Sequence, residues 1–499
     1  MDWKGVTLMA IAGIDVGTAA AKLTVYDENG TLLFSGFRDY PTSRGMGKSE
    51  LDAHLVRDAV FALLREAAQT VAIEAVGVSA FGESFVLLDE KDEPVLPVML
   101  YTDPRGGVEA ESLAARVPGI DGICGAKPHS MYSLPKLMWI KNNDPAAYKR
   151  ARRVCLMEDY VTYLLTGERA IDWSEAARTM ALDVERRAWS DEILGAAGID
   201  KSLFSRVVRT GEVVGTIRPA RASALGLSKS MRVVAGCHDQ VAAAVGSGVL
   251  APGAATDGAG TTQCMTPVFE KWDRDGRLQR DNYVVVPFLQ PGRYVTYAFQ
   301  FTGGAVAKWY VENMAGYTSG QAGYEALEAR MSDAPTGMLL LPHFAGAATP
   351  YMDAGSQGAI LGLTLEKTQA DVYRAVLEGV CYEMALNRER LAACGIRIAS
   401  LNATGGGARS RRWLQMKADV LNVPIQRMKN DDAGTIGGIM LTGVACGAFP
   451  GLAEAAKTFV GVRETYEPRA DFHERYLEIY ERYRKVYDAV RPLMGGNES

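Results

Sequence analysis

The sequence predicts an α/β protein of two related lobes with a cleft between them. At 499 residues, the chain exceeds what one hydrophobic core usually holds. A short apolar strand ends at Asp15 and runs into a turn containing Gly17 and Thr18, and a similar turn, residues 258–262, follows Pro252-Gly253. One such strand and turn in each half favours two similar lobes. We place their boundary near residue 250, which gives lobes 1–250 and 251–499.

Hydrophobic periodicity and turn residues indicate the elements of the first half. Strands are expected over residues 11–14, 22–26, 31–35 and 75–80, and helices over 50–71, 131–143 and 158–166. Asn29-Gly30 lies between two of these strands, and this dipeptide tolerates the positive φ of a tight hairpin turn.

The second half repeats the theme. A strand over residues 400–404 runs into three glycines, and helices are expected over 410–421, 435–446 and 472–493. The helix 435–446 is rich in small residues, so it can pack very close to its neighbours. The tail helix carries tyrosines at 476, 480, 483 and 487, a spacing typical of a structural face.

Composition and charge exclude several classes of protein. A formal charge of −5 argues against nucleic acid or an anionic membrane as the partner. No apolar stretch reaches the roughly 18 residues that span a bilayer, and Met1 to Gly5 lack the features of a signal peptide. The seven cysteines are scattered without a CxxC pair, which makes a disulfide framework or a structural zinc site unexpected. We therefore expect a reducing cytoplasm.

Two carboxylates at strand ends indicate phosphoryl transfer. Asp239 ends the apolar strand that begins at Val233, much as Asp15 ends the first one. Asp15 can organise a metal and phosphates while Asp239 accepts a proton from the attacking hydroxyl. Alternatively, Asp239 caps a helix that starts at Gln240, and both roles can coexist in one side chain. His238 is assigned to packing or to the substrate side rather than to the base.

Three glycine-containing turns are candidates for phosphate or nucleotide binding. Gly17 lets the backbone approach a phosphate, Thr18 adds a hydroxyl, Lys22 follows, and Asp15 can hold Mg²⁺ through water. In the second half the corresponding residues are Gly260, Thr261 and Thr262, and the glycine run is Gly405, Gly406 and Gly407. The run could receive adenine or ribose, with the following helix N-terminus facing phosphate. Taken alone, each of the first two turns could equally be structural, and a glycine run such as 405–407 is more often a packing turn.

Polar side chains in two first-half segments could bind a substrate. Gly82 and Glu83 follow one predicted strand, and Asp103 and Arg105 lie in a nearby loop. Such groups could hold sugar hydroxyls, although charges in loops are usually solvated.

Taken together, these segments resemble the FGGY family of carbohydrate kinases. Residues 131–143, Met-Tyr-Ser-Leu-Pro-Lys-Leu-Met-Trp-Ile-Lys-Asn-Asn, fit the first signature of the family. The second is matched by Gly358-Ala-Ile-Leu-Gly-Leu363 and, after seven residues, by the run from Asp371 to Glu378. The resemblance extends from about residue 10 to 490.

The resemblance implies two ribonuclease H-like lobes of the actin and hexokinase superfamily that close over ATP and a sugar. It implies that Asp239 is the catalytic base and that Asp15, Gly17 and Thr18 meet the terminal phosphate and Mg²⁺. The second-lobe turn would meet phosphate, and the glycine run and Asp432 would contact ADP. Homodimers are expected by analogy alone.

The substrate implied by the resemblance is a ketose or related polyol, with a pentulose of the D-xylulose type as the leading prediction. Xylulokinases usually carry Met-His where this chain has Gly82-Glu83, and residues 101–105 are closer to those of rhamnulokinases. Rhamnulose or fuculose, and glycerol or a tetritol, are therefore alternatives. A non-enzymatic nucleotide switch of the actin or chaperone type is the competing class.

Overall fold

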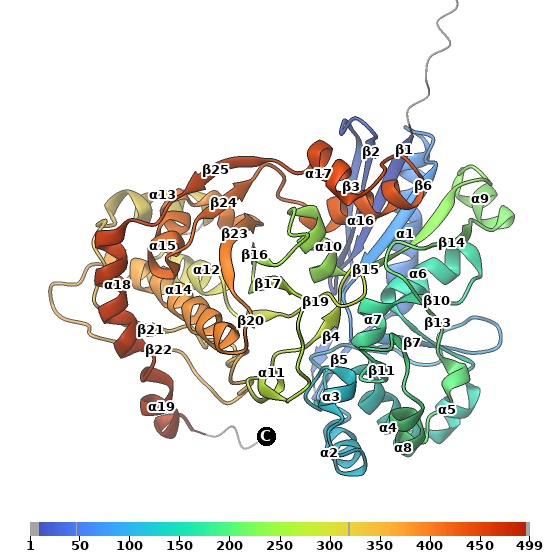
Figure 1. The fold of residues 1–499 in the computed structure, drawn as a ribbon, viewed down its shortest axis with the longest axis horizontal. Coiled ribbons are helices and arrows are strands. Elements are labelled where there is room, and N and C mark those ends of the chain that lie inside the picture. Colours follow the sequence, from blue (N-terminus) through green and yellow to red (C-terminus); the bar gives the residue numbers. More distant parts are fainter. Residues whose placement is uncertain (1–8, 46, 318–319, 496–499) are drawn as a thin grey trace, which may run out of the picture.

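Two mixed β-sheets, each flanked by helices, form the cores of two lobes (Figure 1). The computed structural model describes residues 9–45, 47–317 and 320–495, so the N-terminal segment Met1 to Gly5 lies outside the described residues. The two-lobed α/β architecture predicted from the sequence is confirmed. Within the described ranges, no helix combines the length and the apolar character needed to cross a bilayer.

The first sheet has the strand order β14-β15-β6-β1-β2-β3. Strands β1, β6 and β15 run parallel, whereas β2, β3 and β14 are antiparallel to their neighbours. The bounds are β1 Ala10–Val16, β2 Ala20–Asp27, β3 Leu32–Asp39, β6 Ala75–Ala80, β14 Val213–Thr216 and β15 Arg232–His238. Buried on both faces, β1 and β6 are almost continuously apolar.

The second sheet repeats this pattern in the order β18-β19-β17-β16-β23-β24-β25, with β20 also paired to β17. Here β16, β23 and β24 are parallel and β16–β17 is the hairpin. The bounds are β16 Gly253–Ala259, β17 Gln263–Phe269, β18 Val286–Pro287, β19 Tyr294–Val295, β20 Ala298–Gln300, β23 Ile398–Thr404, β24 Ile425–Met428 and β25 Val462–Tyr466. Each lobe is thus built on a hairpin followed by two parallel strands.

Helices and short strands surround the two sheets. In the first half the helices are α1 Ala53–Ala68, α2 Gly107–Arg116, α3 Asp121–Cys124, α4 Ser133–Asn143, α5 Pro145–Arg150, α6 Met157–Thr166, α7 Trp173–Ala177, α8 Asp191–Ala197, α9 Pro219–Leu225 and α10 Asp239–Gly246. In the second half they are α11 Arg277–Arg280, α12 Gly304–Trp309, α13 Gly320–Arg330, α14 Gln369–Ala393, α15 Arg411–Leu421, α16 Ala433–Ala445, α17 Leu452–Phe459, α18 Ala470–Tyr483 and α19 Val486–Val490. The short strands are β4 Ser43–Gly45, β5 Lys48–Leu51, β7 Phe85–Leu88, β8 Val98–Met99, β9 Arg153–Leu156, β10 Ala170–Asp172, β11 Leu182–Asp183, β12 Ala188–Trp189, β13 Arg206–Val208, β21 Leu339–Leu341 and β22 Ala359–Leu361.

Helices α10 and α16 join the two lobes. They pack against each other, and α16 also packs on β1 and β6 although it comes from the second half of the chain. Glycines allow this approach: a Cβ at Gly437 would clash with the carbonyl oxygen of Ala242, and one at Gly246 with that of Ala433. The close packing predicted for the small-residue helix is confirmed.

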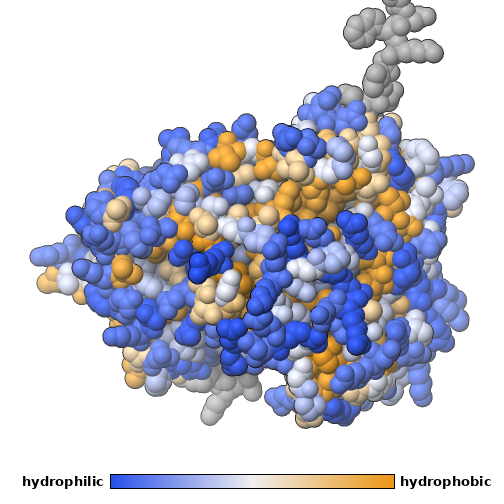
Figure 2. Space-filling model, viewed as in Figure 1, coloured by the Kyte–Doolittle hydropathy of each residue, from blue (hydrophilic) through white to orange (hydrophobic). Residues whose placement is uncertain are grey.

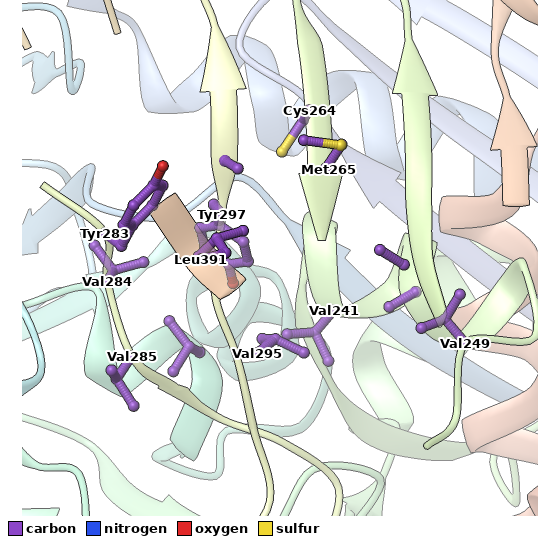
Figure 3. Close-up of a cluster of buried hydrophobic side chains, with 14 of the residues drawn as sticks. Val241, Val249, Cys264, Met265, Tyr283, Val284, Val285, Val295, Tyr297 and Leu391 are labelled. Carbon is purple, nitrogen blue, oxygen red and sulfur yellow. The ribbon is translucent and has the colours of Figure 1, made fainter. Parts of the chain in front are cut away.

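The hydrophobic core continues from one lobe into the other. Val241 of α10 and Val249 pack in the same cluster as Met265 of β17 and Val295 of β19 (Figure 3). On the face shown in Figure 2, hydrophilic side chains dominate and hydrophobic ones gather where the elements of the two lobes meet.

Two predicted helices differ from the structure. Glu50 belongs to β5, because it pairs with Met99 of β8, and α1 begins only after Asp52, whose side chain accepts a hydrogen bond from the N–H of His54. The tail is two helices rather than one. Its break lets the Tyr487 hydroxyl donate to Asp353 (2.8 Å), whereas the hydroxyl of Tyr480 binds Glu389 of α14.

Candidate active site

Asp239 lies where β15 passes into α10. The N-cap position belongs to His238, whose Nδ1 accepts from the N–H of Gln240, so the capping contact expected of Asp239 is made by its neighbour. About a third of the Asp239 side chain is exposed (33%). Its buried Oδ1 lies 3.2 Å from Nδ1 of His238 and accepts no hydrogen bond from the residues that the structure describes. Burial, followed by the charges of Asp15 and Glu83, raises the pKa of Asp239 to about 8.

Asp15, near the end of β1, is the second carboxylate of this group. Its strand neighbours are Lys22 of β2 and Ser79 of β6. Burial raises the pKa of Asp15 to about 6, against the opposing effects of Lys22 and Ser79. Gly434 of α16 packs on this carboxylate, since a Cβ there would lie 3.1 Å from Oδ2.

The structure brings Lys22 and Asp432 together. They form an ion pair between β2 and the start of α16, and both are partly exposed. In the adjoining turn the N–H of Gly17 donates to the carbonyl of Ala20 (2.8 Å), and the Tyr40 hydroxyl donates to the carbonyl of Gly17 (2.6 Å). The half-buried Thr18 lies in this turn.

The hairpin tip of the second lobe, Gly260, Thr261 and Thr262, is exposed. Its carbonyls point at the start of α12: the N–H of Gly303 donates to Thr261 (2.9 Å) and that of Gly304 to Gly260 (2.8 Å). The N–H of Gly260 donates to the carbonyl of Thr262 (2.9 Å), so the tip can offer an anion the threonine hydroxyls and the N–H groups of Thr261 and Thr262.

A cavity of about 680 Å³ adjoins this tip. Its wall includes Gly260, Thr261, Gly406, Gly407 and the aromatic side chains of Trp309, Tyr324, Tyr373 and Trp413. The volume and the aromatic lining suit a nucleotide. Gly405 has a φ of 80° and, like Gly407, packs on Ala259, so the glycine run also serves packing.

Glu83 belongs to a buried cluster on the first-lobe side. With a φ of 64°, it receives a hydrogen bond from Arg178 Nε to its Oε1 (2.7 Å). The guanidinium of Arg178 lies between the rings of Tyr132 and Tyr297, 5.3 and 5.2 Å from their centroids. A Cβ at Gly82 would lie 2.7 Å from His238 Cδ2, so glycine is required there.

His238 completes this cluster. Its ring stacks on Tyr297 at 5.1 Å, and the Tyr297 hydroxyl is 3.0 Å from Nδ1. Burial, and then the charge of Arg178, holds the pKa of His238 well below its usual range, so the imidazole is neutral. A cavity of about 140 Å³ adjoins Arg178 and Tyr297, and Asn282 and Tyr351 of the second lobe also line it.

Asp103 and Arg105 form a separate network. The Asp103 carboxylate accepts from the N–H of Ser49 (2.8 Å) and from Arg105 Nε (2.8 Å), and Arg105 Nη2 also binds Glu50 (2.6 Å). Burial alone would raise the pKa of Asp103, but these hydrogen bonds hold it below its usual range. The pair therefore braces its loop against β5, and its predicted contact with the substrate stays a prediction.

Sequence reasoning missed Arg178, Tyr132 and Tyr297. Arg178 ends the short helix α7, 95 residues from Glu83, and nothing local marks it as a partner. The available signal was Glu83 itself, because a carboxylate at the end of a buried strand needs a compensating cation.

A metal would be held by few protein ligands. Among the described residues, no group of three or more His, Cys, Asp or Glu side chains is placed to hold an ion. The unpartnered Oδ1 of Asp239 and the neighbouring Asp15 fit a Mg²⁺ ion that takes most of its ligands from phosphate and water.

Two related lobes, two carboxylates at strand ends and a glycine-containing hairpin beside a cavity of about 680 Å³ fit one class of protein, the phosphotransferases with an alcohol group as acceptor. The model of the N-terminal domain of the FGGY family of carbohydrate kinases matches residues 10–246, and that of the C-terminal domain matches 259–446. The chain belongs to this family. It is a carbohydrate kinase with ATP as co-substrate, and the non-enzymatic switch is set aside.

Known proteins align along nearly the whole chain. A xylulose kinase of Escherichia coli is 29% identical over 492 residues, covering 97% of this chain and 99% of that protein. A glycerol kinase of Nitratidesulfovibrio vulgaris is 29% identical over 495 residues, covering 93% and 95%. The crystal structure of a xylulose kinase from Rhodospirillum rubrum has a TM-score of 0.88 at 25% identity and covers 97% of this chain and 99% of its own.

Proposed function

We propose that this protein phosphorylates a ketose with ATP, that a pentulose of the D-xylulose type is its preferred substrate, and that Asp239 is the general base. One observation carries the assignment: a carboxylate with an unpartnered oxygen lies beside the Glu83–Arg178 cluster and close enough to Asp15 to be influenced by its charge. Xylulose kinases among the similar proteins support the pentulose.

The two carboxylates suit different tasks because their pKa values differ. At neutral pH Asp15, with a pKa of about 6, is mostly ionised and can face Mg²⁺ and phosphate. Asp239, with a pKa of about 8, can accept a proton from a hydroxyl and release it later. Bound Mg²⁺, held by Asp15 and Asp239 through water, would offset the charge on the transferred phosphoryl group.

Sugar binding is assigned to the cluster around Glu83. The bonds from Arg178 go to Oε1, which leaves Oε2 of Glu83 for a sugar hydroxyl. Gly82 and His238 shape the same wall, and the 140 Å³ cavity offers room for the remote end of the sugar. Because both lobes line that cavity, a bound sugar would favour closure and the exclusion of water.

We also propose residues 1–250 as the sugar-binding and catalytic lobe and 251–499 as the nucleotide-binding lobe. The seven free thiols support a reducing cytoplasm as the location. A homodimer remains a prediction that analytical ultracentrifugation tests.

A coupled assay of ADP release across pentuloses, 6-deoxyhexuloses, tetritols, pentitols and glycerol tests the substrate. Pentuloses should give the highest kcat/KM. Glycerol is the second candidate, because a glycerol kinase is similar along nearly the whole chain. Preference for glycerol or a 6-deoxyhexulose would overturn the pentulose assignment and leave the kinase intact.

Replacing the base tests the mechanism. Asp239→Asn keeps the shape of the side chain and removes its proton affinity, so kcat should fall by roughly 10²–10⁴-fold. ATP affinity, measured by calorimetry, should stay nearly unchanged. Wild-type turnover in this variant would refute the assignment of Asp239.

A further inference from the structure

A buried ionic network lies beneath the phosphate hairpin of the second lobe. Lys417 Nζ contacts both carboxylate oxygens of Asp257, at 2.9 and 2.7 Å, and Gln263 Oε1 at 3.2 Å. The amide Nε2 of Gln263 in turn donates to Asp257 Oδ1. The side chains of Lys417 and Asp257 are both fully buried (0% exposed). All three N–H groups of the ammonium therefore face an oxygen.

Each member of the network is attached to a different part of the candidate nucleotide site. Asp257 lies on β16 and Gln263 is the first residue of β17, so the two flank the tip Gly260–Thr262. Lys417 lies on α15, which follows the glycine run. The network thus ties both strands of the hairpin to one helix.

The same helix carries part of the cavity wall. Lys417 Nζ lies 4.6 Å from the centroid of the Trp413 ring, and Trp413 lines the 680 Å³ cavity. Trp413 also packs on Gly407, because a Cβ there would approach its ring to 2.9 Å. A displacement of Lys417 would therefore change the position of the hairpin relative to the aromatic wall.

A fully buried ion pair is an expensive way to hold a fold together, since apolar side chains of similar size often stabilise as well or better. Its advantage is directional: three hydrogen bonds fix one arrangement of the strands and the helix. We propose that Lys417, Asp257 and Gln263 are positioning residues that hold the phosphate hairpin at a set distance from the site of the nucleoside. This inference rests on the proposed binding of phosphate at the hairpin.

The test compares nucleotides with and without phosphates on the full-length protein. Lys417→Met keeps the apolar stem and removes the charge. Calorimetry should show ATP and ADP binding weakened by roughly tenfold or more, because small misplacements of binding groups have large costs. Adenosine lacks the phosphates that the hairpin is proposed to bind, so it should bind within about twofold of the wild-type affinity. Equal weakening of adenosine and ATP, or an unchanged ATP affinity, would overturn the proposal.

Loss of one buried charge can prevent folding, so a second variant is needed. Asp257→Leu/Lys417→Met removes both charges and leaves no unpaired ion. Its melting temperature should approach that of the wild type while the selective loss of ATP affinity remains. A stable double variant with normal ATP affinity would show that the network serves stability alone.

Asp419 supplies the matched control on the same helix. It is buried and pairs with Arg469, on the side of the tail helix rather than of the hairpin. Asp419→Asn should lower the melting temperature without changing the ratio of adenosine to ATP affinity. A similar change in that ratio would overturn the assigned role of Lys417.

Nucleotide binding is measured without sugar, so these results do not depend on which sugar is phosphorylated. If ATP does not protect wild-type Thr261 and its hairpin neighbours from hydrogen exchange, the proposed phosphate site itself fails. If it protects them and the variants behave as wild type, only the positioning role fails.

Discussion

The hairpins that open the two sheets share a topology and use their acidic residue in opposite ways. In β1–β2 the last paired residue is Val16, and Asp15 stands one position before it. In β16–β17 the last pair involves Ala259, and Asp257 stands two positions before it. Because side chains alternate along a strand, this single step turns the two carboxylates to opposite faces of equivalent sheets.

The environments of the two acids follow from that step. Burial raises the pKa of Asp15, and the charge of the partly exposed Lys22 offsets that rise only in part. Asp257 is buried beneath its hairpin and neutralised by Lys417, and the tip above it presents no acidic group. The first hairpin therefore offers a carboxylate for chemistry. The second offers neutral hydrogen-bond donors at its tip, and the charged pair beneath them is buried.

The largest expected effect concerns stability in the second hairpin. Asp257→Asn leaves the Lys417 charge buried without its counter-ion, which should lower the free energy of unfolding by about 3–5 kcal/mol. Denaturant unfolding followed by circular dichroism measures this. If the free energy of unfolding fell no more than for a typical surface substitution, the proposed difference between the structural Asp257 and the catalytic Asp15 would be wrong.

Asp15→Asn should show the opposite profile. Removing this charge should lower kcat by roughly 10²-fold, as expected for a group that stabilises charge in the transition state. Stability should not fall at pH 8. The folded pKa of Asp15, about 6, lies above its unfolded value, so the stability it contributes is present at low pH and lost as pH rises through about 6. Steady-state kinetics tests the fall in kcat, and thermal denaturation at pH 8 tests the unchanged stability.

The pH dependence of activity tests the electrostatic coupling between Asp15 and Asp239. A base must be deprotonated, so kcat/KM of the wild type should rise with pH to a plateau above about 8. In Asp15→Asn a neighbouring negative charge is gone, and the acid limb of the residual activity should move to lower pH. Identical limbs in the two proteins would contradict the coupling.

The smallest effect is expected at the exposed ion pair of the first hairpin. Lys22→Gln breaks the contact with Asp432, and because both side chains are partly exposed the stability change should stay below about 1 kcal/mol. Without the lysine the pKa of Asp15 should rise further, which an NMR titration of the Asp15 carboxyl group would reveal. A large destabilisation would show that Lys22, like Lys417, is needed for the stability of the fold.

The sequence predicted the features that local chemistry determines. Strand ends at Asp15 and Asp239, the glycine turns and the close-packed helix α16 all depend on residues adjacent in the chain. Partnerships across the chain were not predictable: Arg178 meets Glu83 and Lys417 meets Asp257 only once distant elements are packed. Glu50 was assigned to a helix for the same reason, since its pairing with β8 overrides local periodicity.

Because α16 comes from the second half of the chain but packs on the first sheet, the first lobe cannot be isolated without it. This helix covers β1 and β6, where Gly13 and Gly77 admit its backbone. A polypeptide truncated at residue 250 would lack that lid and expose a strip of apolar strand surface to water. The halves are thus distinguishable in shape yet mutually dependent, and co-expressing them, rather than isolating either, is the way to reconstitute the enzyme from pieces.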